Sequence, residues 1–117
     1  MSTPEVPAPE MPYSGLLGQL VKHMRLSKNI DQLAMANAVG VSQSAYSRIE
    51  SGDTNMSVWQ LRMCAQQLGV RPSQLLTQVE VAEQKLFSQG VTVVAEKRSN
   101  PAAALIGIAI LAALLSS

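Results

Sequence analysis

The sequence predicts an all-α protein with five helices in one domain, followed by a C-terminal apolar helix. From Ser14 to Gly90, apolar residues recur at three- and four-residue steps, and glycine or proline separates the segments that have this spacing. This spacing is typical of helices with one buried face. From Pro101 to Leu115 there is no polar side chain, which predicts a helix that offers no face to water. A chain of 117 residues has room for one small domain with extensions.

Composition narrows the class of protein. The net charge is only +1, so no overall basic field indicates a nucleic-acid partner, although Lys22, Arg25 and Lys28 fall close together. The single cysteine, Cys64, excludes an internal disulfide and a cysteine zinc site, which fits the reducing cytoplasm. Residues 1–13 are rich in proline and lack the basic-then-apolar order of a signal peptide. We interpret them as a flexible N-terminal arm.

The first two helices carry recognisable boundary signals. Leucines, a valine and a methionine at helical spacing predict a helix from Ser14 to near Lys28. Asp31 can cap a short second helix, Gln32–Ala38, and Gly40 stops it.

The third and fourth helices also have residues that can cap their N-termini. Ser42 can cap a third helix, Gln43–Glu50, which Gly52 ends. Ser57 stands three residues before a glutamine, which is the spacing of a capping box. It opens a fourth helix that runs to Leu68.

A fifth helix and the C-terminal segments complete the expected organisation. Pro72 suits the first turn of the fifth helix, and a 4-3-4 apolar spacing extends it, so that the folded domain spans residues 14–89. Residues 90–99 are expected to form a linker or, at VTVVA, a short strand. The apolar helix is expected within residues 100–117.

The second and third helices form a distinctive pair. Each has about two turns and is too short to be stable alone, so they must pack on each other and on their neighbours. Ala36 allows close approach, and Gly40 permits a sharp turn between them. Apolar side chains are expected inside: Met35, Val39, Val41, Tyr46 and Ile49. Polar side chains are expected outside on the third helix: Gln43, Ser44, Ser47 and Arg48. Amide and guanidinium groups of this kind form bidentate pairs with adenine and guanine.

The segment QLAMANAVGVSQSAYSRIES, Gln32–Ser51, resembles the helix-turn-helix of the phage repressor and Cro family. The similarity extends from about Leu16 to Leu76 and includes the small residue at 36, the glycine at 40 and the RIE-x-G ending. The resemblance implies a five-helix domain that places its third helix, the recognition helix, in the major groove of DNA.

The resemblance also implies roles for individual residues. Gln32 would hold a DNA phosphate, aided by the partial positive charge of a helix N-terminus, and would brace Gln43. The other expected DNA contacts are Ser42, Ser44, Ser47 and Arg48, with Asn55 on a phosphate in the following loop. The alternative for Gln32 and Gln43 is that they are ordinary solvated helix starts.

Arg25 has two interpretations. It lies in the basic cluster and could bind a phosphate, but the resemblance implies that it pairs with Glu50 at the end of the recognition helix. Such a pair would fix the orientation of that helix, because losing one partner would strand a buried charge. We favour this structural role, and expect Lys22 and Lys28 to be solvated or to touch the DNA backbone.

The remaining polar residues form no catalytic set. His23 and Cys64 have no partners at metal-ligand or catalytic spacing, and Cys64 shares a face with leucines, which predicts burial. No nucleophile–base set, paired carboxylates or phosphate loop is found in the sequence, which therefore indicates neither an enzyme nor a cofactor. Trp59 falls on an outer position of the fourth helix, where the N-terminal arm or a second subunit could cover it.

The apolar C-terminal helix needs a partner surface, because no face of it suits water. It spans about 22 Å, less than the roughly 30 Å of membrane hydrocarbon. As a tail anchor, residues 101–115 would leave Lys97 and Arg98 on the cytoplasmic face of the inner membrane. As an oligomerisation helix, they would use Ala103 and Gly107 for close approach between copies. Folding back on the domain is disfavoured, because the domain has little apolar surface left to offer.

The sequence therefore predicts a cytoplasmic, bacterial or phage transcription regulator that binds double-stranded DNA as a homodimer or higher homo-oligomer. It would repress or activate transcription, and we favour repression. The alternatives are an antitoxin of the same fold and a membrane-tethered or self-assembling scaffold. An adjacent toxin gene would identify the antitoxin, and the absence of salt-dependent DNA affinity would indicate the scaffold.

Overall fold

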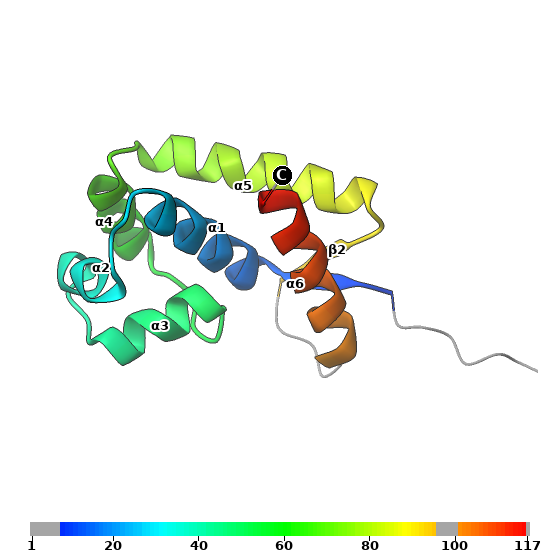
Figure 1. The fold of residues 1–117 in the computed structure, drawn as a ribbon, viewed down its shortest axis with the longest axis horizontal. Helices are drawn as coiled ribbons and strands as arrows, with labels where there is room; N and C mark the ends of the chain where they lie inside the picture. Colours follow the sequence, from blue (N-terminus) through cyan, green and yellow to red (C-terminus); the bar gives the residue numbers. More distant parts are fainter. Residues whose placement is uncertain (1–7, 96–100, 117) are drawn as a thin grey trace, which may run out of the picture.

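The computed structural model describes residues 8–95 and 101–116. Its elements in chain order are β1 (Glu10–Pro12), α1 (Tyr13–Ser27), α2 (Gln32–Val39), α3 (Gln43–Ser51), α4 (Val58–Leu68), α5 (Pro72–Ser88), β2 (Thr92–Val94) and α6 (Pro101–Leu115). Figure 1 shows α2, α3 and α4 together at one end of the molecule, α1 and α5 along its length, and α6 toward the other end. The predicted all-α class is confirmed, and the five domain helices have bounds within one residue of those expected.

Local side-chain caps fix where the middle helices begin. Asp31, Ser42 and Ser57 each accept a hydrogen bond from the backbone N–H three residues further on. At α4 the predicted capping box is complete, because Gln60 also accepts from the Ser57 backbone N–H. These bonds satisfy donors that a helix start leaves unpaired. The helix starts are therefore set by nearby residues.

The two short strands form a parallel pair that the sequence predicted only in part. β2 lies within the expected strand at residues 91–95, which is confirmed. Within the expected flexible arm at residues 1–13, the segment 10–12 is instead the strand β1, in which Met11 pairs with Val93 of β2; residues 1–7 lie outside the described residues. The physical reason is burial: the Met11 side chain is only 1% exposed and lies in the hydrophobic core.

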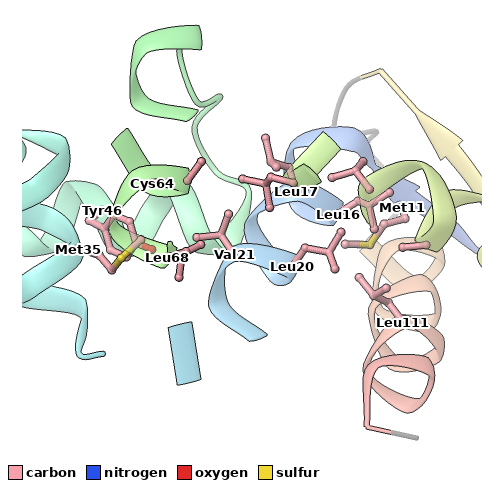
Figure 2. Packing of buried hydrophobic residues seen from close by; sticks show 14 of the residues in the cluster. Met11, Leu16, Leu17, Leu20, Val21, Met35, Tyr46, Cys64, Leu68 and Leu111 are labelled. Carbon is pink, nitrogen blue, oxygen red and sulfur yellow. The ribbon is translucent and has the colours of Figure 1, made fainter. Parts of the chain in front are cut away.

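One hydrophobic core runs along the molecule, with α1 contributing to both ends. Figure 2 shows Met35, Tyr46, Cys64, Leu68 and Val21 at one end, and Leu17, Leu20, Leu16, Met11 and Leu111 toward the other. Cys64 is buried, as predicted. The core therefore joins the helix-turn-helix to β1 and α6 through a single continuous set of contacts.

α6 packs on its own chain, against β1 and α5. Ala103, Gly107 and Leu111 face inward and are buried, and Leu111 points toward the end of the core that holds Met11 (Figure 2). A Cβ atom on Gly107 would overlap the carbonyl oxygen of Glu10. Helix and strand thus approach to a distance that only glycine allows.

This packing corrects the expectations for the apolar tail. The sequence disfavours folding back because the domain has little apolar surface left to offer, but β1, which the sequence does not predict, supplies a docking surface. Gly107 allows the close approach of α6 to β1, and Ala103 is buried on the same side of the helix. Across residues 8–95 and 101–116, no helix combines the length and the hydrophobicity of a membrane span. Lys97 and Arg98, which would flank the expected anchor, lie outside the described residues.

α1 and α3 come into direct backbone contact at Gly18. A Cβ atom there would lie 2.5 Å from the carbonyl oxygens of Ile49 and Glu50, which is closer than van der Waals contact permits. The C-terminal turn of α3 is therefore seated on the backbone of α1. This contact fixes the position of the recognition helix relative to the rest of the domain.

Candidate nucleic-acid interface

α2 and α3 form a helix-turn-helix with a buried inner side. Gly40 ends α2 with φ of 82°, a left-handed conformation that glycine adopts at little cost. The N–H of Val41 then donates to the carbonyl of Ala36 at 3.0 Å. Tyr46 and Ile49 bury the inner side of α3. The two helices therefore form one unit whose opposite side is free to meet another molecule.

The residues of α3 that the sequence assigned to DNA contact lie on an exposed surface. All four are exposed in the structure: Gln43, Ser44, Ser47 and Arg48. Positions three and four apart lie on the same side of a helix, so these side chains form one polar surface. Ser42 is exposed as well, but its hydroxyl caps the helix by accepting from the Ala45 N–H and lies 3.2 Å from the Ser44 hydroxyl.

The other polar and basic residues that the sequence singles out are exposed as well. Asn55 is exposed in the loop between α3 and α4. Lys22 and Lys28, at α1 and its C-terminal cap, are also exposed. Exposed side chains of these types are free to contact phosphates, which usually receive half or more of the hydrogen bonds in a protein–DNA interface.

The expected ion pair between Arg25 and Glu50 is present and buried. Arg25 Nε donates to Glu50 Oε2 at 2.7 Å, and Nη2 donates to Oε1 at 3.0 Å. Arg25 Nη1 also donates to the carbonyl of Ile30, just before α2. The side chains of the pair are only 7% and 3% exposed. One guanidinium therefore ties α1 to the end of α3 and to the start of α2, and it is not available to a phosphate.

The charge state of Glu50 follows from this pairing. Burial alone would raise the pKa of its carboxyl group, but the hydrogen bonds from Arg25 and Gln32, together with the nearby Tyr46 hydroxyl, lower it below its ordinary value. The hydrogen bond to Glu50 raises the pKa of Arg25. Glu50 is therefore ionised at neutral pH, and the ionised form holds α3 in place.

Gln32 has a different partner from the one expected. Its Nε2 donates to Glu50 Oε1 at 3.0 Å, and its side chain is half-buried. A hydrogen bond to a charged carboxylate is stronger than one to a neutral group, so the Gln32 amide is drawn to Glu50, and the bracing of Gln43 stays a prediction. Sequence reasoning missed this contact, although the glutamate ending α3 and the glutamine starting α2 were both singled out.

The Tyr46 hydroxyl completes the surroundings of Glu50. It is buried, and among the described residues no atom meets it in good hydrogen-bond geometry, yet it lies near enough to the Glu50 carboxylate to help lower its pKa. Burial, and then the neighbouring carboxylate, raises the pKa of Tyr46 well above its ordinary value. The hydroxyl is thus a neutral donor facing a buried anion.

Trp59 and Cys64, the two other unusual side chains, lie outside this network. Trp59 is 60% exposed, with the Arg62 guanidinium 5.4 Å from the centre of its ring, a cation–π arrangement. The N-terminal arm was one of the two expected covers for Trp59. Its strand β1 instead pairs with β2 and packs against α6 and α1. The thiol of Cys64 is buried, which raises its pKa to about 12, so it is not a reactive nucleophile.

A short helix-turn-helix with an exposed polar recognition helix defines a class of DNA-binding regulatory proteins. Residues 21–75 match a family model described as helix-turn-helix. This segment is therefore a helix-turn-helix domain of the phage repressor and Cro type, as its sequence predicted.

Solved structures show the same fold. Two crystal structures of the clp gene regulator ClgR from Corynebacterium glutamicum are similar to this chain. One has a TM-score of 0.56 at 23% identity, covering 60% of this chain and 91% of that one. The other has a TM-score of 0.62 at 22% identity, covering 66% and 82%. No curated protein sequence matches the chain significantly.

Proposed function

We propose that this protein is a sequence-specific transcription regulator that occupies an operator as a homodimer and represses transcription. The observation that carries the proposal is the exposed polar surface of α3, held rigidly by a buried ion pair that the DNA does not need to touch. The regulator role of ClgR, which has the same fold, supports the same class of function.

Direct base reading is assigned to α3. Gln43, at the first position of the helix, carries an amide that can form a bidentate pair with adenine, and Arg48 carries a guanidinium suited to guanine. Ser44 and Ser47 offer hydroxyl groups to base edges or phosphates. In a two-fold symmetric complex, two copies of α3 would read half-sites about one helical turn apart.

Backbone positioning is assigned to Gln32, Ser42 and Asn55. The Gln32 side chain keeps its carbonyl oxygen and a second N–H after bonding Glu50, so the amide can join a phosphate to the buried network. Ser42 caps α3 and lies at the N-terminus of the helix, where an anion is favoured. Such contacts add affinity without reading sequence.

Substitution of Gln43 tests base reading. A binding site is first selected from random DNA, and affinities for this site and for unrelated DNA are then measured by titration. Gln43→Ala should weaken binding to the selected site by about 1–3 kcal/mol and barely change binding to unrelated DNA. Gln67→Ala, an exposed glutamine at the C-terminal end of α4, serves as the matched control and should change neither. Equal losses on both DNAs would show that Gln43 does not read sequence.

The salt dependence of binding tests the function itself. Phosphate contacts release counterions, so log affinity should fall linearly with log salt concentration. A chain that shows no salt-dependent DNA binding would instead use its helix-turn-helix for protein contacts.

A further inference from the structure

α6 keeps an exposed apolar surface after it has packed on its own chain. Leu105 is 66% exposed and Ile108 is 37% exposed, and Ala109 and Ala112 are exposed as well. We call these four residues the outer α6 face. At 100° per residue, they lie on the side of the helix opposite to the buried residues Ala103, Gly107 and Leu111.

The chemistry of the outer α6 face restricts what can cover it. α6 has no charged or hydrogen-bonding side chain from Pro101 to Leu115, so the face offers nothing to an anion, a cation or a polar peptide. Only an apolar partner surface can bury the outer α6 face favourably. A second copy of α6 is such a surface, and its lack of charge means that two identical faces do not repel each other.

The sizes of the four side chains favour one arrangement of two copies. The midpoint of the outer α6 face falls between residues 108 and 109. If two α6 helices pack antiparallel about a two-fold axis at this point, Leu105 faces Ala112 of the second copy and Ile108 faces Ala109 of the second copy. Each large side chain then meets a small one, which permits close packing. A parallel pairing would oppose Leu105 to itself and leave a gap between the alanines.

We propose that the outer α6 face is a homodimer interface, in which α6 helices of two copies pack antiparallel about a two-fold axis. Figure 1 shows α6 away from α2, toward the other end of the molecule. The proposal rests on the proposed function, since an operator-binding dimer needs a contact between its two copies. Dimerisation itself can be measured without DNA, from the molecular mass of the protein in solution.

The size of the interface sets the conditions of the test. A 15-residue helix is about 22 Å long and about 10 Å wide, so the contact is smaller than the roughly 800 Å² per partner of a standard interface. The dimer is therefore expected to dissociate in the micromolar range. The full chain is examined by sedimentation equilibrium between about 1 and 200 μM without DNA, with dissociation constants as the readout.

Exchange of a large for a small residue tests the pairing. Leu105→Ala leaves two alanines facing each other, and Ala112→Leu sets two leucines against each other, so each change should weaken dimerisation about tenfold or more. The double variant Leu105→Ala with Ala112→Leu restores a large–small pair and should return the dissociation constant to within about threefold of the original. Leu26→Ala, which changes an exposed leucine of α1, is the matched control. All three substitutions are at exposed helix positions and use strong helix formers.

The outcomes separate this proposal from its rivals. A dimer that both single changes weaken and the double variant restores supports the antiparallel interface. A chain that is monomeric at 200 μM, a dimer that the single changes leave intact, or a double variant as weak as the single ones would overturn it. Preferential binding of the chain to phosphatidylcholine vesicles, lost on Leu105→Ala, would overturn it in favour of a lipid surface. An unchanged chain that dimerises as proposed but shows no salt-dependent DNA binding would support the interface and count against the proposed function.

Discussion

Arg25 and Glu50 meet through two hydrogen bonds of 2.7 and 3.0 Å that join α1 to the end of α3. The carboxylate also accepts from Gln32 of α2, so three helices of the domain converge on one buried anion. This network sets the orientation in which α3 presents its polar surface. Because neither charge is exposed enough to meet DNA, its effect on binding should come through the structure of the domain.

Removal of Arg25 should therefore damage the fold. Arg25→Ala leaves the Glu50 carboxylate buried without its cation, which should lower the free energy of unfolding by about 3–5 kcal/mol. Denaturant unfolding measures this loss, and Lys22→Ala, an exposed position of α1, is the control. A variant that unfolds like the original but binds DNA weakly would instead identify Arg25 as a phosphate contact.

The lowered pKa of Glu50 predicts a loss of stability in acid. A carboxyl group whose pKa is lower in the folded chain than its ordinary value of 4.5 stabilises the fold above that value. This contribution is lost as the pH falls below 4.5 through the lower, folded-state pKa, because the folded state must then take up the proton. Thermal unfolding from pH 7 to pH 3 should show the decline. Glu50→Gln should be less stable at neutral pH and should show a shallower decline; an equal slope in both proteins would assign the acid sensitivity to other carboxyl groups.

Gln32 should contribute to both stability and DNA binding. Gln32→Ala removes a hydrogen bond to a charged group, which should cost about 1.5–3 kcal/mol of unfolding free energy, and it also removes a proposed phosphate contact. Denaturant unfolding and DNA titration at several salt concentrations measure the two effects separately. Gln43→Ala, which lacks the buried contact, should leave stability unchanged. If Gln32→Ala unfolds like the original, the bond to Glu50 is energetically unimportant.

Gly18 should not tolerate a side chain. Alanine is normally favoured over glycine within a helix by about 1 kcal/mol, but a Cβ atom at this position meets two carbonyl oxygens at 2.5 Å. Backbone atoms yield less easily than side chains, and overpacking costs about 1–3 kcal/mol, so we expect a net loss of stability and a shifted α3. The neighbouring change Gln19→Ala provides the comparison in calorimetry. A stabilised Gly18→Ala protein would mean that α1 and α3 separate at little cost.

The sequence by itself determined the helices and their order. Asp31, Ser42 and Ser57 cap helices through bonds that span three residues, and such local interactions depend little on the rest of the fold. The spacing of apolar residues likewise predicted burial of Met35, Tyr46 and Cys64. The ion pair of Arg25 with Glu50 was expected from the family resemblance, since the separation of the two residues in sequence carries no signal of its own.

Only the tertiary structure decided where the two ends of the chain lie. β1 pairs with β2 across about eighty residues, and Gly107 of α6 then packs on the backbone of Glu10. No periodicity reports such a contact, because parallel pairing and helix docking depend on surfaces that exist only once α1 and α5 have packed. The tertiary structure also decides the partner of Gln32. Its side chain donates to Glu50 because the fold buries that carboxylate beside the start of α2.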